Sequence, residues 1–338
     1  MERLALAAEV RGLVEAGNYA EIVHQIDVDG RQGTRISSGV WRSTVKMASF
    51  SEVLTAKAKA EGDWAPLLAA LRSQARQQPA VWLLYADALN AQAWAVRGGG
   101  FAHQVRPEAM ARFREIGRAS RDTLDRHRAL LSAMPEWYVL RLRVALETGE
   151  TEAVRRRLFV EGMLRFPRYL QLYLTRLRDL LPAWGGSQEE ILDLFNQIAR
   201  SSDPAIAEEG LYARLAWYAE QVRSGVLREP TLDGAAFDRA VDAVLDRYPT
   251  QRNLQRFFVM QCQRGNLPAM QRLLPRLKPP MSAELTSDPY TGLLTFQTFE
   301  TCQFLAAGAF KEARIRYWMR EREVEFLLQG AQERAPTP

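Results

Sequence analysis

Side chains that could do chemistry are few in this sequence and lie far apart. The three histidines, His24, His103 and His127, share no spacing that would place two of them on one helix face as metal ligands. His127 falls on the apolar face of a predicted helix, where a hydrogen-bonded structural role is typical. Neither a G-x-S-x-G nucleophile elbow nor a G-x-x-x-x-G-K-[ST] phosphate loop occurs. The sequence therefore predicts a non-enzyme with no metal and no cofactor.

Two glycine-rich loops carry the alternative of an active site. In the loop at 97–101, backbone amides assisted by Arg97 would suit an anion, whereas a turn that needs positive φ is the simpler interpretation. In the loop at 184–187, Ser187 stands where a nucleophile would, and a capping box with Glu190 also accounts for it. An enzyme with its site around Arg97 and Trp184 stays open as an alternative.

A pattern of aromatic, polar and cationic residues favours a binding surface instead. On the helix predicted for 80–96 and at its end, four such residues fall on one side, namely Asp87, Asn90, Trp94 and Arg97. Later segments complete the candidate site with Arg141, Tyr169, Tyr173, Arg176 and Trp184. Binding surfaces favour aromatic residues and arginine, and Trp94 is the expected anchor. If these side chains line a groove, they must be partly accessible; otherwise the rings pack between helices and the arginines face solvent.

Charge is unevenly distributed along the chain. The segment from Arg97 to Arg178 holds 17 arginines against 9 acidic residues, a balance of +8 within a formal net charge of +5. Such a field favours an acidic protein or peptide as the partner. Nucleic acid or another polyanion is the alternative, although no recognisable nucleic-acid-binding module occurs.

The elements that must position these residues are helices. Segments 135–147, 151–165 and 168–181 carry apolar residues at helical spacing and are separated by a glycine turn and a proline. Five turns share a glycine, usually followed by Asn, Asp or Glu and often by an aromatic or apolar residue, with an alanine three to five residues after the glycine. They begin at Gly17, Gly62, Gly149, Gly265 and Gly308. The glycine of such a turn suits the left-handed conformation that ends a helix. This sequence of helices, glycine turns and prolines is typical of stacked helical repeats.

The turns resemble those of the tetratricopeptide repeat, in which a similar Gly-Asn-Tyr turn joins two antiparallel helices. A narrower resemblance rests on the segments 85–101 and 181–190, with the motifs W-A-x-R-G-x-G-[FY] and P-x-W-G-G-S. These segments are similar to a bacterial family of unassigned function. The resemblance implies an all-α fold, a right-handed superhelical stack of antiparallel helix pairs with degenerate repeats, and it implies no catalytic residues. We expect a scaffold or adaptor that binds its partner on the concave face.

Element boundaries follow from caps and breakers. We expect an N-terminal helical cap over 1–60, an α-solenoid over 61–330 and a disordered tail over 331–338. Within the cap, the period is lost over 27–48, and a capping box of Ser49 with Glu52 predicts that the next helix begins at Phe50. Long unbroken helices are predicted for 107–134 and 204–222, and a last helix for the segment ending near 328.

The cysteines and the hydropathy indicate the cellular compartment of the protein. Cys262 and Cys302 lie far apart in helical patterns, which predicts two buried free thiols in a reducing compartment. No secretory signal pattern is visible at the start of the sequence, and no run approaches the roughly 18 apolar residues of a membrane span. We therefore expect a cytoplasmic protein without membrane contact. The sequence does not define the oligomeric state.

Overall fold

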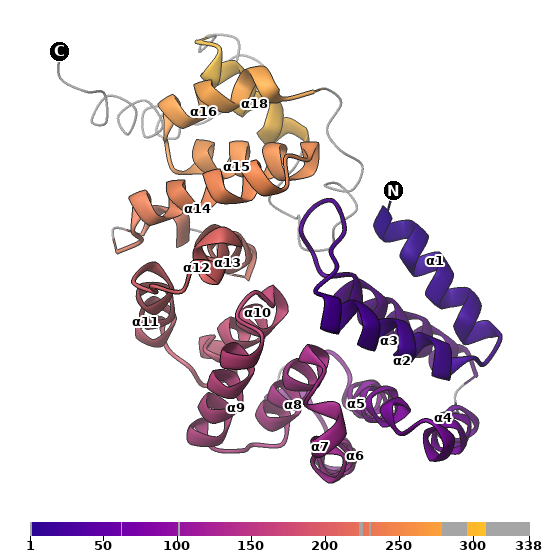
Figure 1. Ribbon diagram of the computed structural model, residues 1–338. Coiled ribbons are helices and arrows are strands. Elements are labelled where there is room, and N and C mark those ends of the chain that lie inside the picture. The colour runs from indigo at the N-terminus through magenta and orange to yellow at the C-terminus, as the bar shows by residue number, and fades with distance from the viewer. Residues whose placement is uncertain are drawn as a thin grey trace. The chain divides into compact units, whose positions relative to one another are not determined.

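The structure is a computed structural model of the 338-residue chain. It describes residues 2–61, 63–100, 102–222, 226–229, 231–278 and 296–308. These residues are helical apart from turns and one isolated antiparallel bridge between Arg35 and Trp41 (Figure 1). The all-α prediction is confirmed. Among the described helices, none has both the length and the apolar character that crossing a bilayer requires.

The chain divides into two compact units, Met1–Ser187 and Gln188–Pro338. The helices of unit 1 are α1 (Glu2–Glu15), α2 (Tyr19–Gln32), α3 (Arg42–Glu61), α4 (Ala65–Gln77), α5 (Trp82–Arg97), α6 (Pro107–Arg126), α7 (Arg128–Leu131), α8 (Pro135–Glu147), α9 (Glu152–Arg165) and α10 (Leu170–Asp179), with 3-10 turns at Pro79–Val81, Ala102–Gln104 and Pro182–Trp184. Those described in unit 2 are α11 (Gln188–Ala199), α12 (Pro204–Glu208), α13 (Leu211–Val222), α14 (Gly234–Arg247), α15 (Gln251–Gln263), α16 (Leu267–Leu273) and α18 (Phe296–Ala306), with 3-10 turns at Val226–Arg228 and Leu274–Arg276. The division falls inside the predicted 61–330 repeat region.

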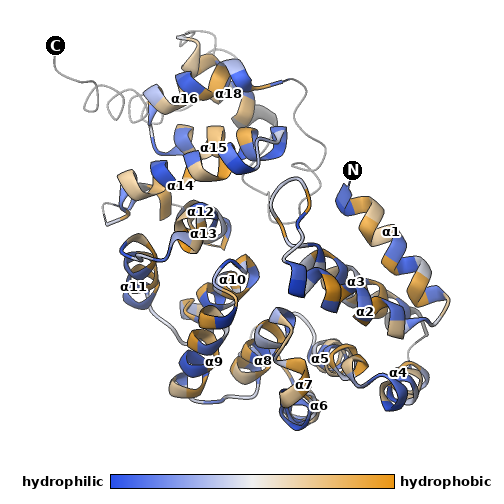
Figure 2. Ribbon diagram, viewed as in Figure 1, coloured by the Kyte–Doolittle hydropathy of each residue, from blue (hydrophilic) through white to orange (hydrophobic). Residues whose placement is uncertain are grey.

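Unit 1 is built from neighbouring helices that pack in chain order. α5 packs on α6, α6 on α8, and α8 on both α9 and α10, while α3 packs on α1, α2 and α5 and also reaches α8 (Figure 1). Apolar and polar residues are interspersed along α1 and its neighbours (Figure 2). In α1 the buried residues Leu6, Val10 and Val14 recur at helical spacing. The largest side chains that this packing buries completely include Trp137, Tyr138 and Tyr173. Both α5 and α10 contact α8, so these three helices are neighbours in the fold.

Glycine turns set the direction of the chain at the predicted places. At the end of α8, Gly149 has a φ of 75°, and the Glu150 amide donates to the Ala145 carbonyl at 2.9 Å. This bond is the mark of a Schellman turn, in which only glycine holds the left-handed position without strain. Three further predicted glycines also have positive φ, at Gly17, Gly265 and Gly308, which confirms them as turns. Gly62 lies outside the described residues.

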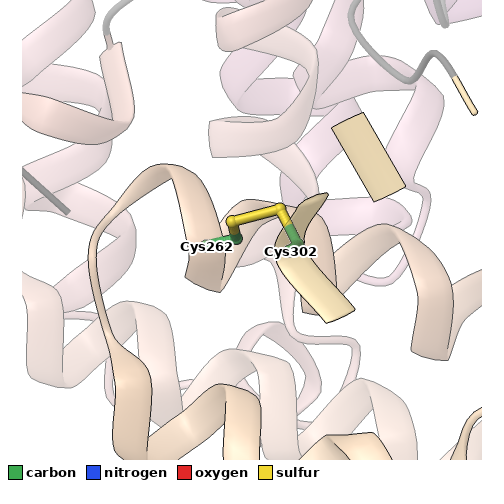
Figure 3. Close-up of a disulfide and its surroundings, with 2 residues drawn as sticks. All are labelled: Cys262 and Cys302. Carbon is green, nitrogen blue, oxygen red and sulfur yellow. A yellow bond between two sulfur atoms is a disulfide. The ribbon is translucent and has the colours of Figure 1, made fainter. Parts of the chain in front are cut away.

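Unit 2 continues with helices that pack on their chain neighbours, α13 on α14, α14 on α15 and α15 on α16. α18 packs on α15 and α16. Cys262 of α15 and Cys302 of α18 are buried, as predicted, but they are joined by a disulfide (Figure 3). The prediction of two free thiols is therefore wrong, because helix packing brings together two cysteines that the sequence separates by 40 positions. The last helix and the tail, predicted beyond residue 308, lie outside the described residues.

The predicted start of α3 is wrong. The helix begins at Arg42, and Ser49, the predicted cap, lies inside it and is buried. The pattern misled because α3 buries polar side chains, including Ser43 and Lys46, where an amphipathic helix would have apolar ones. Lys46 is accommodated by an ion pair with the buried Asp29, Nζ to Oδ2 at 2.7 Å. Within 27–48, the segment 33–41 is indeed not helical, whereas over 42–48 the loss of hydrophobic period reflects buried polar partners.

Two predicted long helices are interrupted. The helix over 107–134 breaks at His127 between α6 and α7, and α8 begins at Pro135. The helix over 204–222 breaks at Gly210, which has a φ of 56°. A Cβ atom there would lie 2.4 Å from the Ala240 carbonyl oxygen of α14. The close approach of α14, which the local sequence does not record, therefore requires a glycine at this position.

Candidate functional site

Aromatic rings of unit 1 gather where α5 and α10 end. The Trp94 ring meets Phe113 of α6 edge to face at a centroid distance of 5.3 Å, and Trp184 at 6.1 Å. Phe113 is buried, whereas Trp94 and Trp184 are partly exposed. Edge-to-face contacts of this kind hold rings in fixed positions. The two tryptophans therefore offer a preformed aromatic surface.

Two arginines lie on this aromatic surface. The Arg97 guanidinium lies 4.9 Å from the Trp94 ring centroid, and the Arg178 guanidinium lies 4.8 Å from that of Trp184. Both arginines are partly exposed, and among the described residues neither forms an ion pair. We call Trp94, Arg97, Phe113, Arg178 and Trp184 the Trp94 cluster. The charges of the two arginines in this cluster are positive and form no ion pair within the described residues.

A buried carboxylate, that of Glu147, contacts the Trp94 indole of the cluster. Glu147, at the end of α8, accepts a hydrogen bond from Trp94 Nε1 at 2.8 Å and another from the Asn90 amide. Burial raises the pKa of Glu147, and the charges of Arg143 and Arg178 work against this rise. Arg143 itself pairs with Asp87, NH2 to Oδ1 at 2.6 Å. The Trp94 indole is thus oriented by a fixed acceptor.

The loops beside Arg97 and Trp184 hold these two residues in place. Arg97 NH1 donates to the Gly98 and Gly100 carbonyls at 2.9 and 3.0 Å, so the glycine loop curls around its own arginine. At the other end, Gly185 has a φ of 87°, and a Cβ at Gly186 would lie 2.2 Å from the Leu180 carbonyl oxygen. Trp184 therefore sits in a turn that two glycines make possible. The first loop turns carbonyls toward Arg97, which is the opposite of an anion cradle made of amides.

The predicted stripe on α5 divides in two. Trp94 and Arg97 are partly exposed, as a binding surface requires. Asp87 and Asn90 are buried, at 2% and 3% exposure, so the expectation that they are accessible is wrong. Each is occupied by a partner on α8, Asp87 by Arg143 and Asn90 by Glu147. Asn90 thus bonds to Glu147, the acceptor of the Trp94 indole, and Asp87 pairs with Arg143.

The remaining predicted site residues, apart from Trp184, also proved buried, and the expectation of accessibility is wrong for them. Arg141 pairs with Asp125 and Glu150, and Arg176 pairs with Glu152 and Asp179. The hydroxyl of the fully buried Tyr173 donates to the Pro167 carbonyl at 3.0 Å. In these cases the arginines cross-link neighbouring helices and the ring packs between them. They are not brought together with the Trp94 cluster.

Tyr169 belongs to a second buried group that sequence reasoning missed. Its hydroxyl donates to Glu136 Oε1 at 3.2 Å and accepts from Thr44 of α3 at 2.9 Å. Glu136 is 2% exposed, and burial raises its pKa to about 7. The nearby charge of Asp27 adds to the rise, whereas the hydrogen bond from Tyr169 opposes it. A glutamate in the first turn of a helix normally suggests a solvated dipole partner, so no local signal revealed this one.

Other candidate chemistry does not assemble in the described residues. His127 stacks on Trp82 at a centroid distance of 4.9 Å, and burial together with Arg126 lowers its pKa. Within the described part of the chain, no three metal-ligating side chains come together. Among the described residues, the Trp94 cluster brings together two partly exposed tryptophans and two arginines that form no ion pair.

Comparison of the chain with family models, with curated proteins and with solved structures gives no match. The resemblance to tetratricopeptide-like proteins and to a bacterial family of unassigned function therefore stays a prediction.

Proposed function

We propose that this protein is a non-catalytic scaffold or adaptor, and that its Trp94 cluster binds an acidic segment of a protein partner. The observation that carries the proposal is the pairing of two partly exposed tryptophans with two arginines that form no ion pair within the described part of the chain. Tryptophan and arginine are the residues most enriched among those that dominate interface energetics. Guanidinium groups bind carboxylates through paired, charge-assisted hydrogen bonds.

The surroundings of the cluster agree with an anionic and partly apolar ligand. Asp87 and Glu147 already have donors of their own, from Arg143 in one case and from Trp94 and Asn90 in the other. The charges left over belong to Arg97 and Arg178. An apolar side chain next to a carboxylate would place its surface on the indole rings and its charge on the arginines. A single acidic peptide segment provides both.

The proposed architecture would put the Trp94 cluster on the concave face of the repeat stack. We propose that the helix pairs stack as degenerate tetratricopeptide-like repeats, with α5, α8 and α10 as the first helices of successive pairs. The packing of α8 on both α9 and α10 supports this proposal. The first helices of such repeats line a concave surface, which is where the Trp94 cluster would lie. A cytoplasmic location remains part of the proposal, and fractionation of the native host tests it.

The experiment is selection of a random peptide library on the full-length protein, followed by affinity measurements. We expect the selected peptides to be rich in Asp and Glu. Trp94→Ala should weaken their binding about 30-fold, or ~2 kcal/mol, as expected for a central anchor. The matched control is Trp82→Ala, because Trp82 is also partly exposed but lies at the opposite end of α5, against His127. Peptides without acidic enrichment, or equal loss in both variants, would contradict the proposal.

A second arm separates peptide binding from binding of a polyanion. The basic segment also exposes arginines on α6, such as Arg114 and Arg118. If single-stranded nucleic acid is the ligand, its affinity should fall steeply with salt, and Arg118→Ala should weaken it as much as Arg178→Ala does. For the proposed peptide site, only Arg178→Ala should matter. Equal effects of the two arginine variants would therefore favour the polyanion function.

A further inference from the structure

A covalent bond in unit 2 joins two helices that are remote in sequence. Cys262 and Cys302 are separated by 40 positions, and their Cα atoms lie 5.8 Å apart, within the usual range for a disulfide. Both residues are buried, at 4% and 2% exposure. Figure 3 shows the bond running directly from α15 to α18. The sequence holds two cysteines, so this is the one disulfide that they can form with each other.

α18 also packs through apolar side chains. Its described packing is on α15 and α16, where Phe299 meets Phe258 edge to face at a centroid distance of 5.8 Å. Leu305 and Ala306 are also buried. An 11-residue helix is too short to be stable by itself in water, so α18 stays helical through this docking. The disulfide therefore holds an element that depends on its attachment.

We propose that Cys262 and Cys302 form a reversible redox latch that docks α18 onto α15 when oxidised and lets it separate when reduced. Closing the latch takes an external disulfide, such as glutathione disulfide. One cysteine thiolate attacks it and forms a mixed disulfide with release of one thiol. The second cysteine thiolate then attacks the mixed disulfide, which forms the Cys262–Cys302 bond and releases the second thiol. The two cysteines lose two electrons and two protons, and the external disulfide gains them.

Burial of the sulfur atoms couples the redox step to movement of the helix. A reductant must reach a sulfur atom in line with the bond, and both cysteines are covered while α18 is docked. Reduction therefore requires a local opening of α18 that exposes a sulfur atom while the bond still joins the two helices, and full separation follows once the bond is broken. In a compartment that keeps thiols reduced, such a bond serves as a transient signal rather than a permanent staple. The latch thus couples the thiol–disulfide state of the surroundings to the exposure of the α15 surface that carries Phe258.

The experiment compares the full-length protein in oxidised and in reduced glutathione. Intact mass after denaturing alkylation should show no alkylated cysteine in the first case and two in the second. Hydrogen exchange should show protected amides in 296–306 only when the bond is closed. The rate of reduction should reach a plateau with increasing dithiothreitol, because opening of α18 becomes limiting. The melting midpoint should fall by about 5 °C or more on reduction.

The control is the double variant Cys262→Ala with Cys302→Ala. Its 296–306 amides should match those of the reduced protein, and neither glutathione form should change them. Two alkylated cysteines after oxidation of the folded protein would overturn the proposal. So would equal protection of 296–306 in the oxidised and reduced protein, since the bond would then not control docking of α18.

Discussion

Two glutamates on α8 face the same side of the helix, about three turns apart, yet they differ in what surrounds them. Glu136, near the start, meets the Tyr169 hydroxyl, which is itself bound by Thr44 of α3. Glu147, at the end, meets nitrogen donors of α5 and the charges of Arg143 and Arg178. Burial raises the pKa of both carboxyl groups. Only at the Glu147 end are the neighbouring rings partly exposed.

The two ends of this helix face differ in how far other elements cover them. At the Glu136 end, the α3 side chains and Trp41 close over the face, with Trp41 against Tyr169 at a centroid distance of 4.9 Å and its Nε1 donating to the Arg168 carbonyl. The carboxyl group there is buried beside the hydroxyl groups of Ser43 and Tyr169, and its burial favours the neutral form. At the Glu147 end, arginines favour the charged form and the surface stays open. Closure by α3 therefore covers the Glu136 end, whereas the rings beside Glu147 stay partly exposed, as the proposed peptide site requires.

The largest expected effect is a change in pH dependence on substituting Glu136. The folded protein holds the pKa near 7, above its ordinary value of 4.5, so folding favours the proton. The stability contributed by neutral Glu136 is therefore present at low pH and is lost as the pH rises through this range. Glu136→Gln should raise the free energy of unfolding by about 3 kcal/mol near pH 8. Near pH 4.5 the gain should be under about 1 kcal/mol, as measured by urea unfolding.

The control for this prediction is Glu108→Gln, in the first turn of α6, because Glu108 is exposed. It should change stability by no more than about 0.5 kcal/mol at either pH. A gain for Glu136→Gln that does not depend on pH would show that packing, and not ionisation, distinguishes this end of α8. The affinity of the Trp94 cluster for acidic peptides should not change in either variant.

Sequence reasoning located most helices and turns because these depend on local rules. Positive φ at Gly17, Gly149, Gly265 and Gly308 follows from the way helices end, and the predicted glycines obey it. The start of α3 failed because its period is broken by buried polar residues. Lys46 can be buried only because Asp29 of α2 faces it, and that pairing depends on how two helices pack.

The candidate site was predicted in part for the same reason. Helical spacing correctly placed Trp94 and Arg97 near each other, and a long side chain at a helix end is often accessible. It could not show that Asp87 and Asn90 are buried, because their partners Arg143 and Glu147 come from a helix more than fifty residues later. Arg178 and the Glu136 group were missed entirely. A buried carboxyl group is recognisable only from the elements that cover it.

A smaller effect is expected at the turn just beyond Glu147. Gly149→Val should lower the free energy of unfolding by about 1 kcal/mol or more, because a β-branched residue is strained at positive φ. A Cβ at this position meets no atom within 4 Å, so the cost is conformational and should leave peptide affinity unchanged. The matched control is Gly12→Val in α1, which also has open space around it but no positive φ and should be nearly neutral. Equal melting midpoints for the two variants would contradict the turn assignment.

The smallest expected effect separates the two glutamates by binding rather than by stability. Glu147→Gln keeps an acceptor for Trp94 Nε1, and the Asn90 amide can turn to meet the new side-chain NH2, so stability should change by less than about 1 kcal/mol. The substitution removes a negative charge beneath Arg178 and leaves the Trp94 cluster more positive. Affinity for an acidic peptide should therefore rise about threefold at low salt, or ~0.6 kcal/mol, and the gain should shrink as salt screens it. Isothermal titration of both glutamine variants against the same peptide measures this. A gain at Glu136→Gln as large as that at Glu147→Gln would mean that the peptide does not bind at the open end of α8.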